Sequence, residues 1–190
     1  MMTLPYDTGA AAAYDCLSGR WSNLYLGAVL GQLEPLGGRR LLDLATGTAE
    51  CAVAAAKLID RGLVVGADFS LPMLRGGLHK LGNARISLVA ADAHHLPFKA
   101  DHFDGATCLF GLMFFEDPVV ALKEAFRVLV PGGKLICTTW ATTDRVPWGG
   151  VMAEVLAAEA PHLASELLRP YSMADPDLSL IHISEPTRPY

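Results

Sequence analysis

The sequence lacks the features that carry a chain into or across a membrane. No apolar stretch approaches the roughly 20 residues that a membrane-spanning helix needs, and the segment Met1–Asp7 has no basic stretch followed by an apolar one. Long runs of lysine and arginine are also absent, and the formal net charge is −5. This argues against nucleic acid or an anionic membrane as the main partner. We therefore expect a cytoplasmic protein, neither exported nor inserted in a membrane, that acts on a small molecule.

Cysteine is scarce, and its spacing fits no metal site. The chain has four cysteines, Cys16, Cys51, Cys108 and Cys137, and none of them forms the closely spaced pairs that zinc sites use. Cys108 and Cys137 fall within apolar, strand-like runs, where a buried thiol is expected. The sequence therefore predicts no metal and a reducing compartment, and it leaves the oligomeric state open.

Apolar runs alternate with helix-like segments along the chain. Its 190 residues are 52% hydrophobic and 18% charged, which is enough for one sizeable core. Strands are expected at residues 41–45, 63–68, 86–90, 104–109 and 134–140. Helices are expected at about 49–61 and 71–80, and from Pro118 to a stop at Pro131-Gly132-Gly133. This order predicts an α/β fold with a doubly wound parallel sheet.

The segment Leu41–Glu50 is the most informative, because an apolar run ends in an acid and small residues before a helical pattern starts. Such a turn places a helix N-terminus against a nucleotide-like cofactor. At Gly47 a side chain would collide with the ligand, whereas Ala45 and Ala49 stand where glycine is expected. We expect Ala49 to weaken cofactor binding without abolishing it.

Acids close three successive apolar runs. Asp43 ends the first run, Asp68 the second and Asp92 the third. Asp43 or Asp68 alone would be interpreted as a helix cap. A carboxylate at the tip of the second strand can also accept both hydroxyls of a ribose. The three together predict a cofactor site along one edge of the sheet.

With these motifs in order, the chain resembles the class I S-adenosylmethionine-dependent methyltransferases, in the branch related to the ubiquinone and menaquinone C-methyltransferases. The resemblance is carried by residues 41–50, 65–74, 91–98 and 125–135. It implies a Rossmann-like fold, S-adenosylmethionine as cofactor, and methyl transfer to a small apolar or aromatic acceptor.

The resemblance also implies cofactor contacts. Asp43 would hold the turn and approach the amino end of the cofactor. Asp68 would accept from the ribose, and Asp92 from the adenine amino group. Phe69 and Met73 would cover the faces of the adenine, and Leu109 and Phe110 would lie against the sulfonium. The implied cofactor-binding residues are Asp43, Ala45, Thr46, Gly47, Thr48, Asp68, Phe69, Met73, Asp92, Ala93, Leu109 and Phe110.

The acceptor site is expected after the fourth strand, at residues 110–116, and under an N-terminal helical lid, residues 1–38. The candidate substrate-binding residues are Tyr14, Trp21, Met113 and Phe114. Methyl transfer needs no dedicated catalytic residue, because holding the reacting atoms in place supplies much of the rate. The nearest candidates for a general base are His94, His95 and Glu116.

Two other functions share part of this pattern. A nicotinamide-dependent oxidoreductase would also use Asp68, but its G-x-G-x-x-G turn differs from the single glycine of residues 45–50. A non-catalytic module that binds S-adenosylmethionine would keep every cofactor contact. Methyl transfer to a panel of acceptors would distinguish the module from an enzyme.

The C-terminal residues 178–190 are interpreted as an artefact. Leu178–Arg188 matches the translation of a transposase sequencing adapter, although its alternating pattern would also fit an edge strand. Residues 39–177 are then a cofactor-binding domain that stops before the C-terminal antiparallel strands of its relatives. Because the strand 134–140 would lack a neighbour, we expect a poorly soluble chain.

Overall fold

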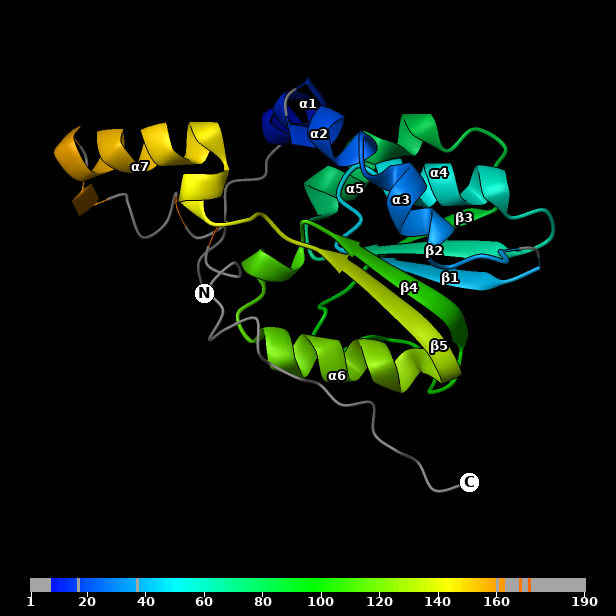
Figure 1. Ribbon diagram of the computed structural model, residues 1–190. Coiled ribbons are helices and arrows are strands. Elements are labelled where there is room, and N and C mark those ends of the chain that lie inside the picture. Colours follow the sequence, from blue (N-terminus) through cyan, green and yellow to red (C-terminus); the bar gives the residue numbers. More distant parts are fainter. Residues whose placement is uncertain are drawn as a thin grey trace.

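A five-stranded sheet forms the centre of the computed structural model, which describes residues 8–16, 18–36 and 38–159, together with residues 161, 162, 168 and 171. The strands lie in the order β3-β2-β1-β4-β5 (Figure 1). Their bounds are β1 Arg40–Leu44, β2 Leu63–Asp68, β3 Ile86–Ala90, β4 Phe103–Leu109 and β5 Leu129–Thr138. All four pairings are parallel, so the carboxyl ends of the strands share one edge of the sheet.

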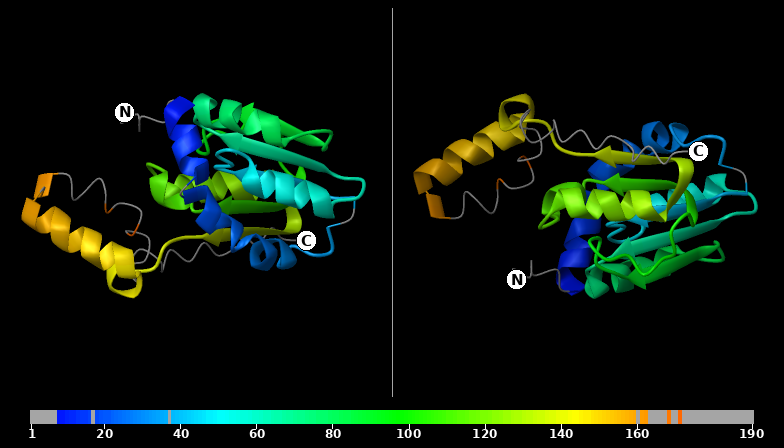
Figure 2. Two further views of the ribbon diagram at one scale, coloured as in Figure 1. Left: turned by 90° about the horizontal axis from the view of Figure 1, so that it is seen from above. Right: turned by 90° about the horizontal axis from the view of Figure 1, so that it is seen from below.

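Helices cover both faces of this sheet (Figures 1 and 2). One face carries α1 Thr8–Cys16, α2 Ser18–Asn23, α3 Leu26–Gly31, α4 Glu50–Leu58 and α5 Leu71–Gly77, which the 3₁₀ turn η1 Leu78–Lys80 follows. The other face carries α6 Pro118–Val128. The 3₁₀ turn η2 Leu112–Phe114 precedes α6. The 3₁₀ turn η3 Thr143–Arg145 precedes α7 Pro147–Glu159, which extends away from the sheet. The predicted Rossmann-like, doubly wound α/β fold is confirmed.

The core has two layers because neighbouring residues of each strand point to opposite faces. Leu42 is fully buried and packs in the cluster that contains Ala125 of α6. Leu41, next to it, packs on the opposite face with Leu30 of α3 and Ala52 of α4. The apolar runs read from the sequence are therefore strands buried on both sides.

Some predicted boundaries are wrong. The helix expected to reach Pro131 ends at Val128, and Pro131-Gly132-Gly133 lies inside β5. The β4–β5 register shifts there, and Gly132 has a φ of +78°. Within the described residues β5 pairs only with β4, and an edge strand tolerates a proline and an irregular ladder. In the described part of the segment expected to form an N-terminal helical lid, residues 1–38, three short helices follow one another, α1, α2 and α3.

Three further expectations concern the C-terminal tail, the antiparallel strands and membrane-spanning helices. The interpreted adapter tail, residues 178–190, lies outside the described residues. Within those ranges the sheet contains no antiparallel strand. No helix described there combines the length and the apolar character that a bilayer crossing demands.

Candidate functional site

The turn between β1 and α4 lies where the strand order reverses, since β2 flanks β1 on one side and β4 on the other. Open α/β sheets bind ligands at this point, outside the carboxyl ends of the strands. The turn is tight: Ala45, Gly47 and Ala49 have φ values of +54°, +56° and +66°. Left-handed backbone suits glycine, so both alanines adopt a conformation that costs them energy.

Replacing Ala45 by glycine is expected to raise the free energy of unfolding by about 0.5–1 kcal/mol, because glycine relieves the left-handed strain of a half-buried residue. The matched change Ala56→Gly, at a half-buried position inside α4, should lower it by about 1 kcal/mol. Urea unfolding of both variants measures the difference. Equal losses would contradict the left-handed turn.

Asp43 fixes the turn from within the protein. Its carboxylate is 3% exposed and accepts hydrogen bonds from Oγ1 of Thr46 at 2.5 Å and from Oγ1 of Thr107 at 2.7 Å. Burial raises the pKa of Asp43, and the hydrogen bonds from both threonines oppose that rise. Thr107 stands opposite Asp43 in the β1–β4 register. Thr107 was not predicted from the sequence, where its only signal is a hydroxyl inside an apolar strand.

Asp68 ends β2 and reaches across to the same turn. One carboxylate oxygen accepts from the Gly47 N–H and the other from the Ser70 N–H, each at 2.7 Å. Burial raises the pKa of Asp68, and these two amides oppose the rise. Each oxygen keeps another acceptor position, so the carboxylate can still receive two hydroxyl donors. Ser70 also caps α5 by accepting from the Met73 N–H at 3.3 Å.

A small space lies over Gly47. A methyl group at this position would lie 3.4 Å from Cε of Met73 and 3.9 Å from Cε1 of Tyr14. Burial raises the pKa of the Tyr14 hydroxyl. Phe69 is 64% exposed and lies at the outside of the site. The structure therefore brings Gly47, Asp68, Met73 and Tyr14 together, while the side chain of Trp21 in α2 lies outside the described part.

An ion cluster joins α1 to the turn. Nζ of Lys80 lies 2.7 Å from a carboxylate oxygen of Asp15 and 2.6 Å from one of Glu50. It also donates to the Thr48 hydroxyl at 3.0 Å, and that hydroxyl donates to Asp15. The Lys80 side chain is only 15% exposed. Thr48 was predicted from the sequence, whereas the three charged residues were not, because nothing local in the sequence connects them.

The N-terminal helices leave little room above the turn. A cavity of about 20 Å³ remains there, which has space for about one water molecule. Tyr14, Ser22 and Leu26 form its cover, and Asp43, Ala45, Thr46, Thr48, Glu50, Cys51 and Leu109 complete its wall. The N-terminal helices therefore pack closely over the turn.

The acceptor-side residues are divided between surface and core. Phe110 stacks on Trp140 with ring centroids 4.6 Å apart and packs edge-to-face with Tyr25 at a centroid distance of 5.5 Å. Met113 is 3% exposed and packs inside the protein, whereas Phe114 is 37% exposed. Of these two predicted substrate contacts, only Phe114 reaches the surface. Trp140 and Tyr25 were not among the predicted residues.

The three candidates for a general base differ in their surroundings. His94 contacts Asp92 through Nδ1 at 2.6 Å, and its Nε2 accepts from the backbone N–H of Asp117 at 3.1 Å. His95 and Glu116 are exposed. Burial opposes the charge of Asp92, but the hydrogen bonds from His94 outweigh it and lower the pKa of that carboxyl. Ala93, beside them, is 7% exposed.

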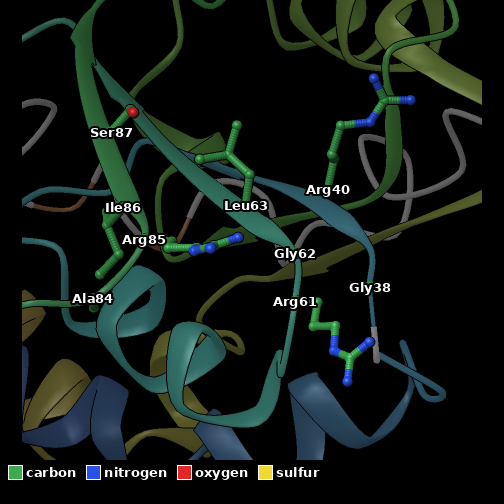
Figure 3. A pocket seen from close by; sticks show the side chains of 9 residues that line it. All are labelled: Gly38, Arg40, Arg61, Gly62, Leu63, Ala84, Arg85, Ile86 and Ser87. Carbon is green, nitrogen blue, oxygen red and sulfur yellow. The ribbon is translucent and has the colours of Figure 1, made fainter.

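A larger cavity, of about 580 Å³, opens at the opposite edge of the sheet (Figure 3). Arg40, Arg61 and Arg85 line it near the amino ends of β1, β2 and β3. The guanidinium groups of Arg40 and Arg61 point in different directions and do not converge. Since ligands of such sheets bind at the carboxyl ends of the strands, the cavity is separate from the candidate site.

Comparison with known proteins places the site in a family context. A sequence profile of the ubiE/COQ5 methyltransferase family matches residues 15–147, which include the turn and all three strand-tip acids. A demethylmenaquinone methyltransferase from Corynebacterium kroppenstedtii is 36% identical over 173 residues, covering 90% of this chain and 70% of that protein. The chain spans about half the length of further relatives with the same name, between 41% and 55%.

Solved structures agree on the fold. An S-adenosylmethionine-dependent methyltransferase from Mesorhizobium loti is 26% identical, with a TM-score of 0.56 over 63% of this chain and 55% of that one. A structure from Methanococcus maripaludis reaches a TM-score of 0.65 over 88% of this chain and 78% of its own, at 21% identity. At that identity the likeness shows the fold alone.

Proposed function

Because the chain belongs to the ubiE/COQ5 methyltransferase family, we propose that it methylates a small aromatic acceptor of the demethylmenaquinone type. S-adenosylmethionine is the cofactor, and when bound it supplies an electrophilic methyl group on its sulfonium. The observation that carries the proposal is the left-handed turn at Gly47, which the Asp68 carboxylate ties to the tip of β2.

The residues of the turn fit such a cofactor. A side chain at position 47 would fill the space between Met73 and Tyr14, so glycine keeps that space open for a ligand. Asp68 has unused acceptor positions for ribose hydroxyls, and the exposed Asp92 carboxylate can accept from an adenine amino group. These residues would bind and orient the cofactor. Leu109 would lie near its reactive end.

The acceptor site would contain the aromatic group of Tyr25, Phe110 and Trp140, together with Phe114. Stacked rings next to Leu109 provide an apolar surface on which an aromatic acceptor can lie flat. The cover formed by Tyr14 and Leu26 would exclude water. Holding the acceptor carbon in line with the methyl group then supplies much of the rate.

Calorimetric titration with S-adenosylmethionine and S-adenosylhomocysteine, followed by mass spectrometry of a short-chain demethylmenaquinone, tests the proposal. We expect binding of both cofactor forms and a mass gain of one methyl group in the acceptor. Cofactor binding without transfer to any aromatic acceptor would favour a non-catalytic module. A folded protein that binds neither cofactor form would overturn the proposal, and binding of a nicotinamide cofactor instead would favour an oxidoreductase.

A further inference from the structure

Both ring nitrogens of His94 are occupied, and they contact two different parts of the site. Nδ1 lies 2.6 Å from Oδ1 of Asp92, and the backbone N–H of His94 donates to the same oxygen at 2.9 Å. On the other side of the ring, Nε2 accepts from the backbone N–H of Asp117 at 3.1 Å. The side chain is only 18% exposed, so the packing around it holds this orientation.

These contacts fix the tautomer. A backbone N–H can only donate, so Nε2 must be the unprotonated nitrogen that accepts from Asp117. The ring proton is then on Nδ1, where it donates to the Asp92 carboxylate. A histidine in this state has no free nitrogen with which to take a proton from a substrate.

The two partners of His94 belong to opposite sides of the proposed active site. Asp92 follows β3 and is the carboxylate proposed for the adenine amino group. Asp117 caps α6, where its carboxylate accepts from the N–H groups of Val119 and Val120 at 3.0 Å each. Phe115, in the segment that borders the acceptor, meets the His94 ring with centroids 6.1 Å apart.

We propose that His94 is a positioning residue that couples the adenine-binding carboxylate to the acceptor-side start of α6, an inference that rests on the proposed function. Through Nδ1 it holds the orientation of Asp92, and through Nε2 and Phe115 it holds the segment between η2 and α6. One side chain therefore affects both the affinity for the cofactor and the affinity for the acceptor, although it contacts neither of the reacting atoms.

Two substitutions separate the halves of this bridge. In His94→Asn the amide nitrogen takes the place of Nδ1, so the contact with Asp92 is kept and the contact with Asp117 is lost. In His94→Gln the amide oxygen takes the place of Nε2, with the opposite result. We expect His94→Gln to weaken S-adenosylhomocysteine binding about tenfold. His94→Asn should leave that binding within about twofold and raise the KM for the acceptor instead.

Amide hydrogen exchange at Asp117 provides a readout that requires no cofactor. Exchange at this amide should speed up in His94→Asn and stay slow in His94→Gln. Nitrogen chemical shifts of the His94 ring in the parent protein should show the Nδ1–H tautomer. Lys99→Ala, at an exposed position in the same connection, is the matched control and should change none of these quantities.

The proposal is overturned if both variants alter cofactor affinity and acceptor KM to the same extent, or if neither variant alters either quantity. It is also overturned if the ring carries its proton on Nε2. A parent protein that shows the Nδ1–H tautomer and the protected Asp117 amide, but binds no S-adenosylhomocysteine, would refute the proposed function, and with it the coupling, while leaving the structural bridge intact.

Discussion

Asp68→Ala is expected to weaken S-adenosylmethionine binding by about 100-fold or more. The change removes a charged acceptor for two ribose hydroxyls, and each hydrogen bond to a charged group contributes about 1.5–3 kcal/mol. It also removes the acceptor for the Gly47 N–H, so the turn loses its link to β2. Calorimetry on the intact chain measures the loss.

The matched control for this prediction is Asp60→Ala. Asp60 lies between α4 and β2, its side chain is 85% exposed, and its carboxylate lies 3.7 Å from Nε of Arg61. Surface ion pairs of this kind contribute little, so cofactor affinity should not change. A folded Asp68→Ala protein with the affinity of the parent would remove Asp68 from the cofactor site.

Gly77→Ala should reduce both stability and cofactor binding, although residue 77 is not itself proposed to contact the ligand. A methyl group at the end of α5 would lie 2.7 Å from the carbonyl oxygen of Thr48 and 2.8 Å from its carbonyl carbon. Backbone atoms cannot rotate away as a side chain does, so the turn must shift. We expect unfolding free energy to fall by about 2–3 kcal/mol, measured by urea unfolding.

Gly27→Ala is the control for this prediction. Gly27 lies in α3, and an added methyl would meet no atom within 4 Å. Alanine should therefore stabilise the helix by up to about 1 kcal/mol. If Gly77→Ala were equally harmless, α5 would not pack against the turn as described.

The strands and the turn could be predicted because their signals are local. Strands buried on both faces need continuous apolar runs, and a tight strand-to-helix turn needs small residues, which the segment Ala45–Ala49 supplies. Ala45 and Ala49 stand where glycine was expected, and their positive φ values show why this backbone favours glycine. Asp43, Asp68 and Asp92 were found for the same reason, since each ends an apolar run.

Contacts between distant segments could not be predicted. The ion cluster unites Asp15, Glu50 and Lys80, which become neighbours only when α1 packs beside α5. The role of His94 depends on Asp117, which is brought beside it by the passage of the chain from β3 to β4 and on to α6. Met113 was predicted to contact the substrate, but it lies in the turn η2 with its side chain buried in the core.

The cover over the turn affects the apparent affinity of the protein for its cofactor. A cavity of about 20 Å³ is too small for a nucleoside, so we expect cofactor uptake to require a displacement of the N-terminal helices. The apparent dissociation constant is then the intrinsic one divided by the open population. If the Lys80 cluster favours the shut conformer by about 1.4 kcal/mol, roughly one molecule in ten is receptive and the apparent affinity falls about tenfold. Cofactor uptake can thus depend on residues such as Lys80, which is not among those proposed to bind the cofactor.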